Sequence, residues 1–162
     1  MREYHLDGLK IDSLKNLFIE FANMVHGRTD LGKQYGQEGY FGNNIESFDD
    51  CLFGGFGLEN PCRIIWQSSE KSRFFLGHKA YLDYCDSAIK NKDYIDEDGL
   101  KYLMKDRELA AAGKGQTVFS LLVDSIKSVD ERSNGRNRIE LVLKWTFRRY
   151  YVDNWKEMNI ES

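Results

Sequence analysis

The sequence predicts an α/β protein with a small three-stranded parallel sheet packed with helices. Three short runs, at residues 3–6, 63–67 and 139–145, have the length and the residue types of strands. Segments with helical periodicity separate these runs along the chain. Strands that are separated by helices need crossover connections, and crossovers give parallel strands. Because only three strands are predicted, the sheet is small and the helices must cover it.

The first strand is expected to end at the turn Asp7-Gly8. Ser13 is then a candidate N-cap for a helix that extends to about Met24. The apolar residues of this segment recur at spacings of three and four, as one buried helical face requires. They are Leu14, Leu17, Phe18, Phe21, Ala22 and Val25.

A glycine-rich loop, residues 27–43, precedes the second predicted helix. Asn44 can cap this helix, which runs from Ile45 to about Phe53. Gly54-Gly55 ends it and leads toward the second strand.

The segment between the second and third strands is predominantly helical. Ser69 is expected to cap a short helix, residues 79–113 have helical character, and Thr117 begins a strongly amphipathic helix. Residues 133–137, Ser-Asn-Gly-Arg-Asn, predict the turn into the third strand. No internal repeat or low-complexity segment interrupts this order.

Composition indicates an ordinary globular protein: 41% of the residues are hydrophobic and 30% are charged. Residues 1–8 are polar and charged and lack the apolar stretch of a signal peptide. No segment approaches the roughly 20 apolar residues that a membrane span needs. Three widely spaced cysteines form neither a disulfide framework nor a metal-binding pair. We therefore expect a cytoplasmic protein with no membrane partner.

The charge is unevenly distributed, although the net charge is only −3. Residues 132–162 carry seven Lys or Arg and four Asp or Glu, a balance of +3, so residues 1–131 carry −6. Within the latter, residues 34–62 contain no Lys or Arg but five acids, six aromatic residues and six glycines. A nucleic-acid surface needs the opposite sign. This window instead favours a basic protein partner and no direct contact with nucleic acid.

The acids of the second predicted helix are the most informative candidates for function. Glu46 and Asp50 are four residues apart and share a helix face, and Asp49 lies between that face and the buried one. No Lys or Arg of the helix neutralises them. A solvated acidic helix face is the alternative interpretation, because such charge clusters are common.

Residues 40–52, Tyr-Phe-Gly-Asn-Asn-Ile-Glu-Ser-Phe-Asp-Asp-Cys-Leu, resemble the signature of the barstar family. The shared order is an aromatic pair, Gly, a polar residue, Asn, an apolar residue, an acid, and a second acid four residues later. In that family a loop and an acidic helix block the active site of a secreted ribonuclease. The resemblance implies a nuclease inhibitor, or immunity protein, that is not an enzyme and needs no cofactor. It places Tyr40, Asn44, Glu46, Asp49, Asp50 and, in the helix from Thr117, Asp124 on the partner-binding surface.

The resemblance also predicts how the chain is divided. It covers about residues 1–145 of a single predicted domain, 1–162, and is weakest at 79–115, which are interpreted as a helical insertion. Residues 146–162 form a C-terminal extension. Two departures concern the site: the first helix acid, usually Asp, is Glu46, and Asp49 stands where an aromatic residue often precedes the second acid.

Two other classes of function remain open on the sequence. A barstar-like regulatory or scaffold module with a partner other than a nuclease would be favoured if the basic tail made the main contact. A small metal-dependent hydrolase using Asp49 and Asp50 is less favoured, because adjacent residues of a helix point in different directions. The glycine-containing segments 54–57 and 113–117 lack the spacing of nucleotide-binding loops, and His5, His26 and His78 are isolated, so no catalytic residue or metal ligand is predicted.

Overall fold

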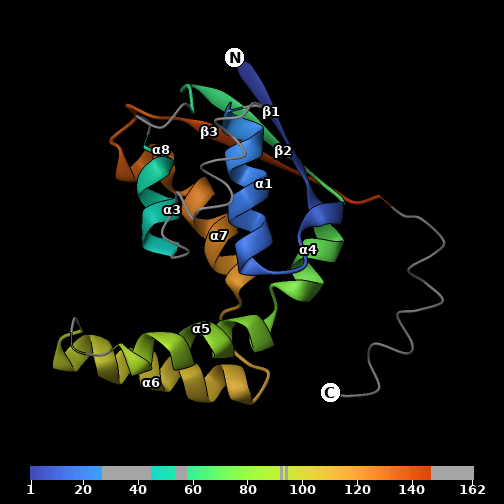
Figure 1. Cartoon of the computed structure of the whole chain (residues 1–162). Helices are drawn as coiled ribbons and strands as arrows, with labels where there is room; N and C mark the ends of the chain where they lie inside the picture. Colours follow the sequence, from blue (N-terminus) through green and yellow to red (C-terminus); the bar gives the residue numbers. More distant parts are fainter. Residues whose placement is uncertain (27–44, 54–57, 92, 94, 147–162) are drawn as a thin grey trace.

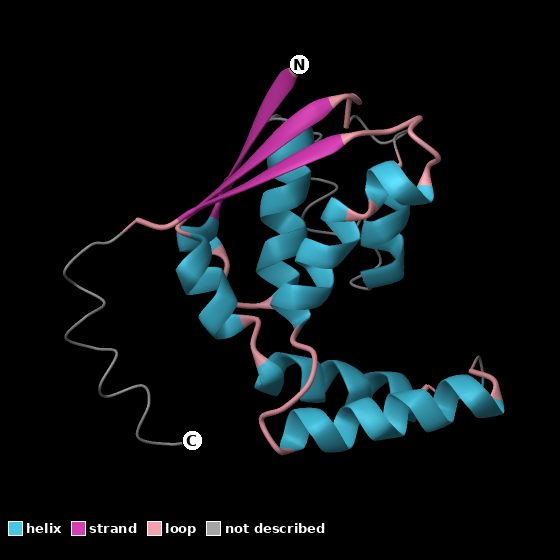
Figure 2. Cartoon of the chain, turned by 180° about the vertical axis from the view of Figure 1, so that it is seen from behind, coloured by secondary structure: helices cyan, strands magenta, loops and turns pink. Residues whose placement is uncertain are grey.

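The computed structural model describes residues 1–26, 45–53, 58–91, 93 and 95–146. Helices α1, α3 and α7 lie on one side of a twisted sheet, and helices α5 and α6 form a separate hairpin on the side of this helical layer away from the sheet (Figures 1 and 2). The predicted α/β class, a small parallel sheet packed against helices, is confirmed.

The sheet contains three parallel strands in the order β1-β2-β3: β1 is Arg2–Asp7, β2 is Cys62–Gln67 and β3 is Ile139–Lys144. The three predicted strands are therefore confirmed within one residue at each end. In the register of the sheet, Ile64 of the central strand lies beside Tyr4 of β1 and Leu141 of β3.

Side chains point alternately to opposite sides along each strand, so the two faces of the sheet differ. Tyr4, Leu6, Ile64 and Trp66 are buried toward the helices. On the opposite face Arg63 of the central strand donates hydrogen bonds to Glu3 and Glu140, its aligned neighbours on the two edge strands, at 2.8 and 2.9 Å. These exposed ion pairs contribute little to stability. They lie on the face of the sheet that no described helix covers (Figure 2).

The caps predicted at Ser13 and Thr117 are confirmed, whereas Ser69 is the first residue of α4 and Ser68 precedes it without a side-chain cap hydrogen bond. Ser13 accepts a hydrogen bond from the amide of Asn16, as expected of the residue that starts α1, and Thr117 and Ser120 form a capping box at α7. The helical elements are η1 Gly8–Lys10, α1 Leu14–His26, α3 Ile45–Cys51, α4 Ser69–Phe75, α5 His78–Lys90, α6 Glu97–Ala111, α7 Val118–Lys127 and α8 Val129–Arg132.

Gly8, directly after β1, lies where two backbone segments approach closely. A Cβ atom at this position would lie 2.3 Å from the carbonyl oxygen of Gln67 and 2.5 Å from that of Ser68. Only a residue without a side chain fits here, so glycine allows the end of β1 to pass against the end of β2.

The segment 79–113, predicted as helical, forms two antiparallel helices (Figure 1). Asp96 begins α6 by accepting a hydrogen bond from the amide of Gly99 at 2.7 Å. Side-chain hydrogen bonds join the packed helices: the Tyr81 hydroxyl donates to Asp106 at 2.9 Å, and Arg107 donates to Asp86 at 2.5 Å. We refer to α5 and α6 together as the helical hairpin.

Candidate functional site

Helix α3 packs one face against the core and turns its acids outward. Ile45, Phe48 and Cys51 are buried, and the Phe48 ring lies 4.8 Å from that of Phe21 in an edge-to-face arrangement. The 3.6-residue period then leaves Glu46 and Asp50 exposed, one turn apart.

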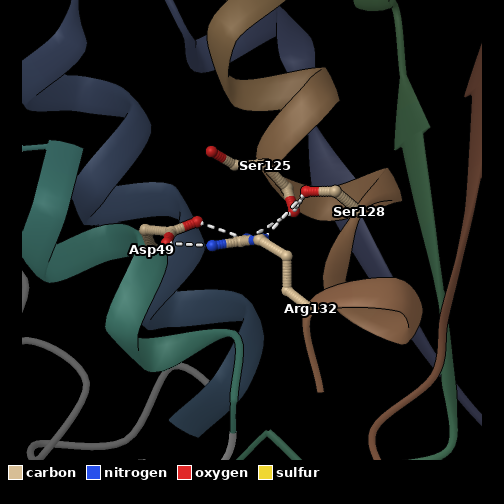
Figure 3. A network of polar contacts seen from close by, with 4 residues as sticks. All are labelled: Asp49, Ser125, Ser128 and Arg132. Carbon is tan, nitrogen blue, oxygen red and sulfur yellow. Dashed lines mark hydrogen bonds and ion pairs between the residues drawn. The ribbon is translucent and has the colours of Figure 1, made fainter. Parts of the chain in front are cut away.

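Asp49 is the acid of α3 that the structure pairs with a cation of the same chain. Arg132 of α8 donates from Nη1 to Asp49 Oδ2 at 2.5 Å and from Nη2 to Oδ1 at 2.7 Å (Figure 3). The hydrogen bonds to Asp49 raise the pKa of Arg132 above its usual range. Asp49 is thus neutralised within the chain, whereas no ion pair to Glu46 or Asp50 is found in the described part.

Glu46 lies next to the helical hairpin. Burial, followed by the negative charge of Glu46 and a hydrogen bond to it, raises the pKa of Tyr84 in α5 to about 12. Tyr84 also stacks on Tyr81, with ring centroids 6.1 Å apart. The hairpin therefore borders the acidic helix at its first turn, a proximity that the sequence does not reveal.

Asp124 is exposed on α7, one of the helices beside α3 (Figure 1). It lines a broad, open hollow together with Ser120 of its own helix, the N-cap residue Thr117, and Tyr84 and Ser87 of α5. Tyr84 therefore lies near both acids: it hydrogen-bonds to Glu46 and lines the same hollow as Asp124.

Two of the expected contact residues, Tyr40 and Asn44, lie outside the described residues. The structure thus brings Glu46, Asp49 and Asp50 together on α3 and places Asp124 on the neighbouring α7. Sequence reasoning did not identify Arg132 or Tyr84. Arg132 is 83 residues from Asp49, and no local motif connects the two positions.

The site offers carboxylates rather than a catalytic constellation. Among the residues that the structure describes, no group of three or more His, Cys, Asp or Glu side chains is arranged to hold a metal ion. The described helices include none that is both long and apolar enough to cross a membrane. What the surface can do chemically is attract and bind cationic groups.

Comparison with models of protein families relates the chain to a known family. A family model described as Barstar (barnase inhibitor) matches residues 1–105, which is more than half of the chain and includes α3 and its acids. The match extends through α5 into α6, and α7 and β3 lie beyond it. Searches of the curated proteins and of the solved structures each find no match. The family match, together with the parallel three-stranded sheet and the outward-facing acids of α3, shows that the chain belongs to the barstar family.

Proposed function

We propose that the protein inhibits a nuclease of the barnase type by covering its basic active site with the acidic surface of α3. The observation that carries this proposal is the exposed pair Glu46 and Asp50, one turn apart and without a cation of the described chain beside either carboxylate. A ribonuclease must present cations to hold RNA phosphate, so a rigid pair of carboxylates can occupy the positions of its substrate's charges. Membership of a family described as barnase inhibitors supports the same conclusion.

In this proposal each contact residue has a distinct role. Asp50 enters the cationic pocket of the partner, Glu46 binds one turn away, and Asp124 contacts the partner from α7. Tyr40 packs at the rim of the interface and Asn44 contributes from the loop before α3. Asp49 belongs to the same surface, although its carboxylate is bonded to Arg132.

The partner we propose is a secreted ribonuclease toxin, and the protein is its immunity protein in the cytoplasm, where the nuclease would otherwise attack cellular RNA. The buried free thiols of Cys51, Cys62 and Cys85 are compatible with a reducing compartment. The inhibition needs no cofactor, no catalysis, and no direct contact with nucleic acid or membrane.

The test is an inhibition titration. Increasing amounts of the protein are added to a fixed concentration of barnase-type ribonuclease, and cleavage of a fluorogenic RNA is followed. We expect activity to fall linearly to zero near one equivalent, and association to slow as salt is raised, because exposed charges are screened. A variant in which Glu46 and Asp50 are both alanine is the matched control and should inhibit poorly. Equal inhibition by this variant would show that α3 is not the inhibitory surface.

A second candidate is a barstar-like regulatory or scaffold module. One observation favours it: Tyr102 and Met104 of α6 expose 72% and 51% of their surface, on a helix that lies away from the sheet. If the wild-type protein leaves nucleases uninhibited, capture experiments should compare it with a variant carrying serine at both positions.

A further inference from the structure

The guanidinium of Arg132 is almost fully occupied within the chain. Besides the two bonds to Asp49, it donates from Nη2 to the carbonyl oxygen of Ser125 at 3.0 Å and from Nε to the Ser128 hydroxyl at 3.0 Å (Figure 3). Its centre lies 4.8 Å from the centroid of the Phe53 ring. A guanidinium has five N–H donors, so these four bonds leave little capacity for a partner.

These contacts join three elements that are distant in sequence. Asp49 lies in α3, and Phe53 follows the end of that helix by two residues. Ser125 belongs to α7, and Arg132 is the last residue of α8. The end of this region is held once more, because the Asn137 side chain donates to the carbonyl oxygen of Phe53 at 3.0 Å. The polar contacts therefore hold α3 against α7 and α8, in addition to the packing of Phe48 on Phe21.

Helix α3 depends on such contacts for its orientation. It has seven residues, and a helix of that length is not stable on its own in water. The buried face of α3 determines which side of the helix points inward. Small rotations about the helix axis, or shifts along it, would still change the directions of Glu46 and Asp50. A bidentate ion pair restrains both movements, since two parallel hydrogen bonds require a defined geometry.

We propose that Arg132 is a positioning residue of the inhibitory surface: it withdraws Asp49 from partner binding and uses that carboxylate to fix α3 against α7 and α8. This inference rests on the proposed function for the identity of the partner. It assigns the two adjacent acids different tasks, with Asp49 bound within the chain and Asp50 directed to the partner. Binding is tighter when the contact groups are held beforehand, because less ordering is required on association.

A direct role for Asp49 in partner binding predicts the opposite effect of removing Arg132 on affinity. If Asp49 bound a cation of the partner directly, Arg132 would compete with that partner, and its removal would strengthen binding. Electrostatics alone also favours tighter binding after a cation is removed from a surface that meets a basic protein. A loss of affinity after removal of Arg132 is therefore specific to the positioning role.

The experiment uses the full chain with Asp49→Asn, Arg132→Gln and both changes together. Arg136→Gln is the matched control, because it removes the same charge nearby from a side chain whose Nε bonds only to the Ser133 carbonyl oxygen. Two quantities are measured under conditions where all variants are folded: amide hydrogen exchange in residues 45–51, and the association and dissociation rates with a barnase-type ribonuclease.

We expect Asp49→Asn and Arg132→Gln each to speed exchange in α3 and weaken binding by about tenfold, mainly through faster dissociation, as loss of a charge-assisted bond predicts. The double variant should be no worse than either single one, because the same contact is lost. Arg132→Lys should restore part of the affinity, since it keeps one charged donor, and Arg136→Gln should leave exchange in α3 unchanged.

Two results would overturn the inference: tighter binding by Arg132→Gln together with weaker binding by Asp49→Asn, or unchanged exchange in α3 after loss of Arg132. Failure of the proposed function is distinguishable, because the wild-type protein itself would then leave the ribonuclease unbound. The exchange measurement would still determine whether Arg132 holds α3.

Discussion

The carbonyl oxygen of Leu76 accepts a hydrogen bond of 2.8 Å from the amide of Phe119. The helical hairpin therefore connects two positions that are adjacent in the fold, Leu76 after α4 and Phe119 at the start of α7. Leu76 is fully buried and Phe119 packs on Trp66, with ring centroids 5.1 Å apart, so both positions are anchored in the core. The residues that flank the segment 79–115 are therefore joined by a hydrogen bond, and its status as an insertion stays a prediction.

Replacing residues 79–115 with a short glycine-containing turn should leave a folded protein. The hairpin contributes Tyr81, Cys85 and Ala110 to the core, so the shortened chain should be less stable than the full one. Cooperative thermal unfolding followed by circular dichroism would check this expectation. A shortened chain with no unfolding transition would show that the hairpin is integral to the fold.

The parallel sheet was predictable because the information that defines it is local. The runs at β1, β2 and β3 differ from the amphipathic helices between them in length and periodicity, and caps such as Ser13 and Thr117 mark helix starts. The pattern of residues 79–113 predicts helical structure but does not show where one helix ends and the next begins, although Asp96 caps the second one.

Contacts between elements explain what the sequence did not show about the site. Asp49 occurs in a run without Lys or Arg, and its cation comes from α8, 83 residues later. Tyr84 approaches Glu46 only because the helical hairpin folds back beneath the first turn of α3. Charge counts along the chain predict the sign of a surface, but they do not predict which acids are neutralised inside the folded molecule.

The buried hydroxyl of Ser72 should contribute measurably to stability. Trp66 donates its indole N–H to Ser72 Oγ at 3.0 Å, and both residues are completely buried. Ser72→Ala leaves that donor without a partner, which costs about 1–3 kcal/mol. For a chain of this size we expect the unfolding midpoint to fall by roughly 2–12 °C. The exposed Ser87→Ala is the control, and an equal effect of both changes would contradict this role.

Alkaline conditions should destabilise the protein through its buried thiols. Burial raises the pKa of both Cys51 and Cys62 to about 11, and the charge of Asp50 adds to the shift at Cys51. A thiol in the unfolded chain ionises near pH 8.5, so the unfolded state binds fewer protons above that pH and the free energy of unfolding decreases. The contribution is fully present below about pH 8.5 and is lost as pH rises through about 11.

Urea unfolding at pH 7.5, 9 and 10 would measure this decrease. Cys62→Ala is the appropriate comparison, since it should lessen the dependence on pH while Lys and Tyr residues still titrate in both proteins. The folded protein should also react slowly with a thiol reagent at pH 8, because its thiols are buried and protonated. Rapid labelling of all three cysteines under native conditions would argue against this account.

Asp50→Ala should weaken binding of the ribonuclease strongly and leave the fold nearly unchanged. Removing one member of a buried interfacial charge pair costs about 2–5 kcal/mol, a range taken from measured complexes that include barnase–barstar and not from this structure. That range corresponds to roughly a 30-fold to 4,000-fold loss of affinity. An exposed acid outside the interface would cost less than about 1 kcal/mol. Asp130→Ala, which removes an exposed acid of α8, supplies that comparison.

The thermal unfolding midpoint separates a contact residue from a structural one. Asp50 is exposed and forms no ion pair with the described residues, so Asp50→Ala should shift the midpoint by no more than Asp130→Ala does. Titration calorimetry and thermal unfolding on the same preparations would give both values. If Asp50→Ala and Glu46→Ala each bind the ribonuclease as tightly as the wild-type protein, the exposed face of α3 is not the interface, and the basic residues beyond β3 become the next surface to mutate.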